Sequence, residues 1–386
     1  MTALRKICVV TGSRAEYGLL QRVIHDLHKD PAVELQLVVT GMHLSPEFGL
    51  TVRVIEQDGF PISDRVEMLL SSDTPVGIGK SVGMGVMAFS ETFVRRTPDW
   101  VLLLGDRFEI LAAAQGALFT QRPIAHLCGG DSTEGSLDEA CRHAITKMAH
   151  LHFVSNAQAQ RRVLQMGEDP ARVFNVGSPG LDTLRQQQLL DRKTLEVALD
   201  CPLRARNLLI TFHPDTLAPG SSVAEFQQLL DALDAIGPDV GLFFTLPNAD
   251  AGGRGLIRMV EVYTAARPNA RAYASLGQQR YLSLAALADA VVGNSSSGFY
   301  EVPSLKRPTV NIGDRQKGRL AADSVLSVAP QKVAIEQAIH KAFTLDCSRT
   351  VNPYGDGHAA ERIVRELKAV QNPQTLLKKH FHLLGA

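Results

Sequence analysis

The chain has 386 residues, of which 45% are hydrophobic, and its 40 acidic and 40 basic residues leave no formal net charge. This length suggests two domains of ordinary size, and a balanced charge without a long basic block disfavours nucleic-acid and membrane-surface partners. Five scattered cysteines without a CxxC pair indicate a reducing cytoplasm, and no apolar run is long enough for a signal peptide or a membrane span.

Strand-like and helix-like segments alternate in the first part of the chain. Strand-like segments lie at 6–10, 33–41, 99–106, 123–130, 152–156 and 172–177, and helix-like segments lie at 15–30, 108–121 and 137–151. The strands are almost continuously apolar, as expected for strands that are buried on both faces. This βαβ pattern predicts a parallel sheet with helices on its faces.

A polar segment that carries Gly and Pro, residues 177–206, interrupts this alternation. The alternation then restarts, with strands at 207–213, 240–248, 270–275 and 291–294 and helices at 223–237, 254–266 and 281–290. We therefore predict an α/β protein with two doubly wound Rossmann-like domains that face a cleft. We place these domains at 1–178 and 179–355, followed by a C-terminal helical segment, 356–386, whose amphipathic helix at about 358–370 packs back on either domain.

Polar side chains follow six of the predicted strands where each strand ends. Ligands of such sheets bind beyond the carboxyl ends of the strands. The residues at these positions are Arg14, Glu16, Asp106, Arg107, Asp131, Glu134, His213, Asn248, Ser295 and Ser296. Six strand ends with polar residues indicate a site more strongly than any single motif does.

Residues 291–319 predict a site for a diphosphate. An apolar strand runs into a glycine, an asparagine and three serines, and a helix-like segment with Glu301 and a basic cluster around Arg315 follow. Hydroxyl groups and free backbone N–H groups at a strand–helix turn bind anions, and an arginine adds fixed positive charge. We expect Glu301 to accept from sugar hydroxyls. The alternative is a polar turn with solvated basic residues.

The helix-like segment at 137–151 carries candidate acid–base groups. Asp138 and Glu139 are also what a helix start prefers, because Ser136 and Glu139 have capping-box spacing and Asp138 can pair with Arg142. A functional role is favoured for Asp138, since the preceding glycine-rich segment holds two more carboxylates and acid–base catalysis needs groups with separated pKa values. His213, which precedes a proline, can serve a phosphate or a leaving group as a cation or donor.

Three sequence patterns resemble nucleotide-binding or metal-binding motifs but do not match them. The segment 76–83 resembles a P-loop, but Thr74 stands where the motif needs glycine, and no GxGxxG follows the first strand. The histidine pairs at 150 and 152 and at 380 and 382 have no second cluster at metal spacing. We therefore expect neither a cofactor nor a metal ion.

Five motifs together resemble a known family. TGSRAEYG, GDRFE, GGDSTEGSLDEACRHAITKMAHLHF, TFHPDT and GNSSSGFYEVPSLKRPTVNIGDRQKGR resemble the UDP-N-acetylglucosamine 2-epimerases, in the hydrolysing branch of sialic-acid-type pathways. The resemblance spans residues 7–325 and implies a two-domain fold like the B-type glycosyltransferases. It implies elimination of UDP to a 2-acetamidoglucal, and then hydration with inversion at C2 to N-acetylmannosamine.

The resemblance also implies roles for single residues. Asp106, Asp138 and His213 match acid–base and leaving-group positions, and Arg14, Ser295, Ser296 and Arg315 match phosphate contacts. Glu301 matches the residue that holds the ribose. Arg142 and Asn248 complete the expected substrate-binding residues. The substrate is thus the expected small-molecule partner, and we expect a homo-oligomer, either a dimer or a tetramer.

One departure from the family pattern bears on the catalytic base. Well-known members carry a glutamate just before the double glycine, and this chain has Cys128 there, which is a poor base for a carbon acid. Asp131 or Glu134 is expected to supply the missing carboxylate. The departure also leaves the substrate open, because hydrolysing epimerases of the legionaminic acid pathway act on a nucleotide-linked 2,4-diacetamido-2,4,6-trideoxyhexose. Three competing functions remain: a non-hydrolysing epimerase, a glycosyltransferase and a non-catalytic nucleotide-sugar binder.

Overall fold

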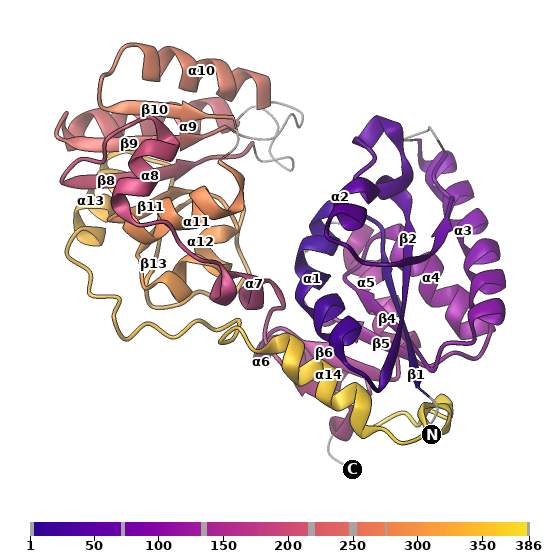
Figure 1. The fold of residues 1–386 in the computed structure, drawn as a ribbon. Coiled ribbons are helices and arrows are strands. Elements are labelled where there is room, and N and C mark those ends of the chain that lie inside the picture. The colour runs from indigo at the N-terminus through magenta and orange to yellow at the C-terminus, as the bar shows by residue number, and fades with distance from the viewer. Residues whose placement is uncertain are drawn as a thin grey trace. The chain divides into compact units, whose positions relative to one another are not determined.

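The computed structural model describes residues 4–70, 74–132, 137–214, 221–246, 253–274 and 276–383. They form two compact units, Met1–Arg185 with Tyr354–Ala386, and Gln186–Pro353. Each unit is a parallel sheet with helices packed against it (Figure 1). The predicted α/β class with two parallel sheets is therefore confirmed.

The first unit contains a seven-stranded sheet in the order β3-β2-β1-β4-β5-β6-β7. The strands are β1 (Arg5–Thr11), β2 (Val33–Thr40), β3 (Ile62–Val66), β4 (Trp100–Leu104), β5 (Ile124–Leu127), β6 (Leu151–Val154) and β7 (Val173–Asn175). The helices are α1 (Arg14–Lys29), α2 (Val52–Gln57), α3 (Pro75–Arg96), α4 (Phe108–Phe119), α5 (Leu137–Met148), α6 (Ala157–Gln165) and α7 (Gly180–Gln186), which ends at the boundary between the units.

Alternating residues of each central strand build a separate core on each face of this sheet, because side chains alternate across a strand. Ile7 and Val9 pack into the core on the face of α1, whereas Cys8 and Val10 pack into the core that includes Phe89 of α3. This arrangement explains why the strands read as continuous apolar runs. The segment 76–83, rejected above as a P-loop, lies inside α3.

The second unit contains a six-stranded sheet in the order β10-β9-β8-β11-β12-β13. The strands are β8 (Arg206–Thr211), β9 (Val240–Thr245), β10 (Ala270–Tyr273), β11 (Ala290–Gly293), β12 (Thr309–Ile312) and β13 (Val325–Val328). The helices are α8 (Arg192–Leu199), α9 (Ser221–Ile236), α10 (Gly253–Ala265), α11 (Gly277–Leu287), α12 (Ser297–Tyr300) and α13 (Lys332–Ala342). Short 3-10 helices lie at Gly41–Leu44, Pro46–Phe48, Pro170–Arg172, Val302–Leu305 and Pro373–Leu377.

The polar segment 177–206, predicted as a break, holds the two short helices α7 and α8. Asp191 starts α8 by accepting a hydrogen bond from the Thr194 N–H. Leu195 and Leu199 of this helix are buried in a core of the second unit. Two buried leucines on an otherwise polar helix give only a weak periodic pattern. This is why the sequence did not predict α8.

The chain ends in the first unit. The helix predicted at about 358–370 is α14 (Ala359–Ala369), and it packs against α1. The buried Asp182 carboxylate accepts from the Ala359 and Ala360 N–H groups at 2.9 and 2.6 Å, and so caps the start of this helix. Among the described residues, no helix has the length and apolarity needed to cross a bilayer.

Candidate active site

Each sheet has one point where its strand order reverses. This point lies between β1 and β4 in the first sheet and between β8 and β11 in the second. Connections leave the sheet in opposite directions there, which opens a crevice beyond the carboxyl ends of the two strands. The polar residues singled out in the sequence after these strands therefore lie where doubly wound sheets bind ligands.

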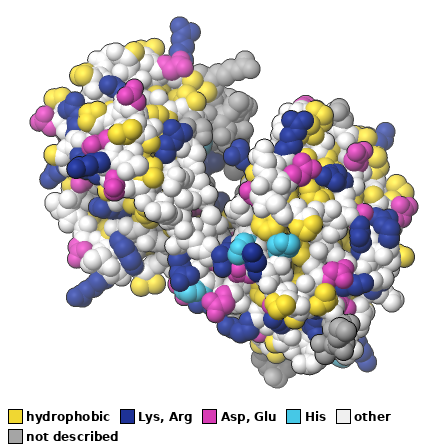
Figure 2. Space-filling view, viewed as in Figure 1, with side chains coloured by type: hydrophobic (Ala, Val, Ile, Leu, Met, Phe, Trp, Pro, Cys, Tyr) yellow, Lys and Arg dark blue, Asp and Glu magenta, His cyan; other side chains and the backbone are white. Residues whose placement is uncertain are grey.

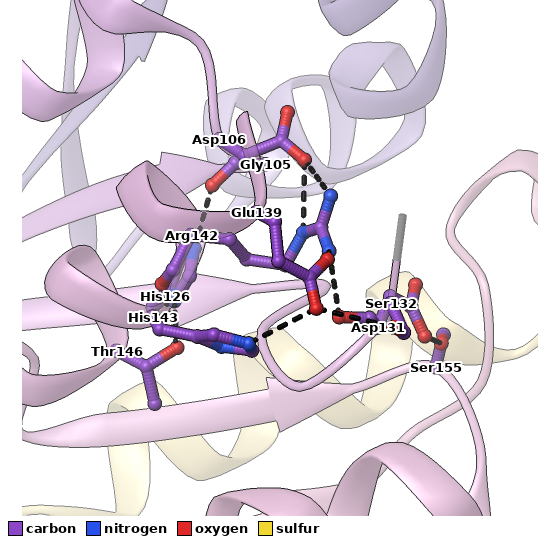
Figure 3. Close-up of polar contacts among 10 residues, drawn as sticks. All are labelled: Gly105, Asp106, His126, Asp131, Ser132, Glu139, Arg142, His143, Thr146 and Ser155. Carbon is purple, nitrogen blue, oxygen red and sulfur yellow. Dashed lines mark hydrogen bonds and ion pairs between the residues drawn. The ribbon is translucent and has the colours of Figure 1, made fainter. Parts of the chain in front are cut away.

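Asp106 follows β4, and its carboxylate is anchored at one oxygen (Figure 3). Arg142 of α5 donates to Asp106 Oδ2 from both Nε, at 2.8 Å, and a terminal nitrogen. The Arg142 side chain is 4% exposed, whereas Asp106 is 24% exposed. Within the described part of the chain, Asp106 Oδ1 has no hydrogen-bond partner, so this oxygen is available to accept a proton.

Arg142 also contacts two further groups. It donates to Glu139 Oε2 at 2.9 Å and to the backbone carbonyl of Asp131 at 2.6 Å. Glu139 Oε1 accepts from Ser132 Oγ at 3.1 Å and lies 3.2 Å from His143 Nε2. The guanidinium therefore connects the end of β4, the turn after β5 and the first turns of α5.

The Asp131 side chain connects the same turn to the start of α6. Its Oδ1 accepts from Ser155 Oγ at 2.8 Å and from Asn156 Nδ2 at 3.1 Å. Asn156 in turn caps α6 through the Ala159 N–H. Asp138 is the second residue of α5 and is half-buried. The predicted residues Glu134 and Asn248 lie outside the described residues.

Cys128 is unsuited to replace a carboxylate base. Its backbone is left-handed, with φ of 61°, and its side chain packs against the core under α1. Burial raises the pKa of the thiol far above its ordinary value, so the group stays protonated. The following Gly130 is required, because a Cβ there would lie 2.4 Å from the Ala159 carbonyl oxygen.

The buried His126 contacts the backbone of Gly105, the residue before Asp106. His126 Nε2 lies 2.8 Å from the Gly105 carbonyl oxygen, and its Nδ1 lies 3.2 Å from Thr146 Oγ1 of α5 (Figure 3). Burial lowers the His126 pKa to about 3, so the imidazole is neutral and donates to the carbonyl from Nε2. The ring thus ties the residue before Asp106 to the helix that carries Arg142.

A second pair of carboxylates lies beside β1: Glu16, which the sequence analysis places after the first strand, and Glu109, which it did not select. Glu16 and Glu109 are buried, and Glu16 Oε2 accepts from the Gly12 N–H at 2.8 Å. Glu109 Oε1 accepts from Arg107 at 3.2 Å. Burial raises the Glu16 pKa to about 8, and the nearby Glu109 adds to this rise. Glu16 lies in the motif TGSRAEYG and Glu109 in the motif GDRFE, so the motifs were the signal in the sequence that could have identified this pair.

Arg14, the first residue of α1, is exposed.

In the second unit, Asn294 joins the ends of β8 and β11. Its Oδ1 accepts from the His213 N–H at 2.7 Å, and its Nδ2 donates to the His213 carbonyl at 2.8 Å. Gly293 before it has φ of 134°, and a Cβ there would lie 1.9 Å from the Thr211 carbonyl oxygen. Only glycine allows this close approach of the two strands.

The predicted phosphate residues surround this junction. Arg315 follows β12, is exposed, and donates to the Asn294 carbonyl at 3.0 Å. Ser296 precedes α12 without capping it, and Ser295 accepts from the Ser297 N–H at 3.4 Å. The second unit therefore holds hydroxyl groups and a fixed cation around one strand end, which is the composition of an anion site.

Glu301 ends α12 in a buried polar cluster. Glu301 Oε2, Ser297 Oγ and the Tyr281 hydroxyl are buried and make no hydrogen bond of normal geometry within the described ranges. Burial raises the pKa of Glu301 above its ordinary value and that of Tyr281 to about 12. Hydroxyl groups nearby, above all that of Ser297, interact with both side chains and oppose these rises in pKa. Tyr281 was not predicted, because an aromatic residue in an apolar helix pattern normally indicates core.

The histidines at 150 and 152 both have partners within the first unit. His150 accepts from the Ile124 N–H at 3.1 Å, and His152 Nε2 lies 2.8 Å from a carboxylate oxygen of the buried Glu168. In the described ranges no group of three or more His, Cys, Asp or Glu side chains has the arrangement to hold a metal ion.

Three comparisons identify similar proteins. The family model described as UDP-N-acetylglucosamine 2-epimerase matches residues 25–368. The chain is 40% identical over 380 residues to the GDP/UDP-N,N'-diacetylbacillosamine 2-epimerase (hydrolyzing) of Campylobacter jejuni, covering 98% of both chains. It is 35% identical to the UDP-N,N'-diacetylbacillosamine 2-epimerase (hydrolyzing) of Legionella pneumophila, covering 97% of this chain and 99% of the relative.

A solved structure shares the fold. The crystal structure of UDP-GlcNAc 2-epimerase from Neisseria meningitidis bound to UDP-GlcNAc has a TM-score of 0.77 at 18% identity. The similarity covers 94% of this chain and all of that one.

Proposed function

This chain belongs to the UDP-N-acetylglucosamine 2-epimerase family, and we propose that it is a hydrolysing 2-epimerase of a nucleotide-linked 2-acetamido sugar. The observation that carries the proposal is the Asp106 carboxylate, with one oxygen held by a buried arginine and the other available. A protein that only bound a nucleotide diphosphate would gain nothing from such a group.

The first stage of the proposed reaction is elimination. A base removes the C2 proton of the sugar, the C1–O bond to the diphosphate breaks, and a C1=C2 double bond forms in a 2-acetamidoglucal. Asp106, Asp131, Glu134 and Asp138 are the candidate carboxylates for this proton transfer. Asp131 Oδ1 accepts from Ser155 and Asn156, and Asp106 Oδ2 accepts from Arg142.

The departing diphosphate needs positive charge and hydrogen-bond donors as its own charge develops. Ser295, Ser296 and Arg315 supply hydroxyl groups and a guanidinium at one strand end. His213 is held beside them by Asn294 and serves as donor or cation toward the leaving group. Glu301, in the same unit, accepts from the ribose hydroxyls.

The second stage is hydration. The glycal gains a proton at C2 on the face opposite to the one that lost it, and the oxygen of water bonds to C1 while a carboxylate accepts the released proton. The products are the free 2-epimeric sugar and the nucleoside diphosphate. One molecule of water is consumed, and no electrons are exchanged with a redox partner.

The names of two relatives favour the sugar N,N'-diacetylbacillosamine, which is a 2,4-diacetamido-2,4,6-trideoxyhexose. We propose the UDP-linked form of this sugar as the substrate, in preference to UDP-N-acetylglucosamine. Cys128 in place of a glutamate is consistent with a substrate outside the N-acetylglucosamine branch.

The test is to incubate the protein with each nucleotide sugar in D2O and to identify the products by NMR. We expect free sugar of inverted C2 configuration, carrying deuterium at C2, from the diacetamido substrate at a higher rate than from UDP-N-acetylglucosamine. Product without deuterium at C2 would exclude elimination through a solvent-exchanging base. A nucleotide-linked product would indicate a non-hydrolysing epimerase, and no product would leave binding as the function.

We also propose that the protein is a homo-oligomer. Val76, Met84, Met87 and Val94 form an exposed apolar stripe on α3, and Phe119 at the end of α4 is 71% exposed. Figure 2 shows hydrophobic side chains at the outer edge of the first unit, where Figure 1 draws α3. Apolar stripes of this kind mark protein interfaces. Light scattering should give a dimer or tetramer, and a monomeric mass for the wild type would refute this proposal.

A further inference from the structure

Arg142 is shared between two carboxylates. Its Nε and one terminal nitrogen donate to Asp106, and its other terminal nitrogen donates to Glu139 at 2.9 Å. All three side chains are buried or at most one quarter exposed, so water screens their charges weakly. The charge on Glu139 therefore changes how strongly the guanidinium stabilises the ionised form of Asp106.

Glu139 is itself held by neutral and titratable donors. Ser132 Oγ donates to its Oε1, and His143 Nε2 lies 3.2 Å from the same oxygen. The ring of His143 is 35% exposed, while its Nδ1 is buried without a partner among the described residues. The Glu139 oxygen that faces His143 is not the one that faces Arg142 (Figure 3), so the two contacts are compatible.

We propose that Glu139 is a positioning residue that keeps Asp106 basic, because its ion pair with Arg142 weakens the interaction of Arg142 with Asp106. We further propose that the contact of His143 with Glu139 controls how strongly Glu139 interacts with Arg142. The proposal rests on the proposed function, in which Asp106 transfers a proton. A carboxylate paired with the whole charge of a buried arginine would be a weak base. Sharing the arginine keeps Asp106 oriented without lowering its basicity to that extent.

Other charged or titratable groups also lie near Asp106 or Arg142. These are Glu16 of α1, His126 of β5, Cys128 and Asp131 of the turn after β5, and Cys141 of α5. None of them is changed in the variants below. A shift of the pH profile on changing Glu139 or His143 therefore comes from the interactions of these two residues, which reach Asp106 through Arg142.

The decisive variants are Glu139→Gln and His143→Phe, which should have opposite effects. Glu139→Gln removes the competing charge, so the acidic limb of the kcat–pH profile should move to lower pH by about one unit. The rate at the plateau should fall roughly threefold, because a less basic carboxylate transfers a proton less readily. His143→Phe keeps a ring but removes the donor to Glu139, so the same limb should move to higher pH. Glu139→Asp, which keeps the charge, is the control and should leave the limb in place.

A purely structural role of Glu139 predicts something else. Loss of packing or of helix capping would lower kcat in both variants without moving the limb in opposite directions. The inference would be overturned if the acidic limbs of the two variants' kcat–pH profiles stayed in place or moved in the same direction. The His143 ring is one-third exposed and phenylalanine is of similar size, so this variant is expected to fold even if Glu139→Gln does not. A His143→Phe limb that stays in place is then sufficient to refute the role.

A second readout is independent of turnover. The carboxyl carbon of Asp106, assigned by its absence in Asp106→Asn, can be titrated by NMR in the wild type and both variants. Its midpoint should move as the limb does. If no nucleotide sugar is consumed by the wild type but the midpoint still moves in opposite directions, the proposed function fails and the electrostatic coupling stands. If turnover is present and the midpoint does not move, the coupling alone fails.

Discussion

The side-chain amide of Asn294 bonds to both backbone polar groups of His213, which precedes it by 81 positions. The two residues follow β8 and β11, the strands between which the second sheet reverses its order. This contact fixes the histidine at the strand junction through its backbone N–H and carbonyl groups.

Asn294→Ala should therefore weaken both the fold and the site. Two backbone groups of His213 lose their partner, and an unsatisfied buried polar group costs about 1–3 kcal/mol. The free energy of unfolding, measured by urea denaturation, should fall by that order, and UDP should bind more weakly in calorimetry. Wild-type stability would show that the bonds are dispensable.

Asp106→Asn should reduce turnover by roughly 10²-fold or more while the protein stays folded. The amide oxygen can still accept from Arg142, so the geometry is kept and only the proton-accepting group is lost. Steady-state release of UDP measures the effect, and circular dichroism checks the fold. Turnover like that of the wild type would remove Asp106 from the mechanism.

The choice of the C2 base between Asp131 and Glu134 can be made with two variants. Asp131→Asn keeps an oxygen that can accept from Ser155 and Asn156 but removes its charge, so the melting temperature should fall only slightly while any rate falls strongly if Asp131 is the base. Glu134→Gln should stop release of UDP and formation of the free sugar if Glu134 is the base, because elimination is the first stage. If both variants keep the full rate, neither residue is the base.

Arg315→Ala should weaken UDP binding by about 1.5–3 kcal/mol, the usual value of a hydrogen bond to a charged group. The matched control is Lys317→Ala in the same loop, because Lys317 is exposed and pairs with Asp314 at 3.4 Å. Calorimetry should show a loss for the first variant alone. Equal losses would indicate a general effect of positive charge in place of a specific contact.

Glu16 should make stability fall with rising pH. In the folded protein its pKa is raised to about 8, from an ordinary value of 4.5. Between these values the folded state keeps a proton that the unfolded chain releases, so the free energy of unfolding decreases as pH rises through this window. Glu16→Gln cannot lose a proton and should flatten this dependence. Glu47→Gln, at an exposed position, should leave the slope unchanged.

The sequence by itself determined the architecture and the positions of the strand ends. Strands such as residues 100–104 are buried on both faces, so they are apolar throughout and stand out between amphipathic helices. Polar residues directly after such strands are placed by the topology alone, which is why Asp106, Asp131, His213 and Ser295 could be selected. The Gly and Asn of residues 293–294 indicated a turn, because few residues adopt such a backbone.

Only the tertiary structure decided how these residues contact one another. Asp106 and Arg142 are 36 positions apart, and their contact depends on how α5 packs beside the end of β4. The two buried glutamates beside β1 and the clamp of Asn294 on His213 likewise depend on the closeness of neighbouring strands. The pattern of a helix start left Glu139 open between capping and a functional role, and the fold directs its carboxylate to Arg142, Ser132 and His143. Local sequence specifies where a side chain emerges, and long-range packing decides which charges it meets.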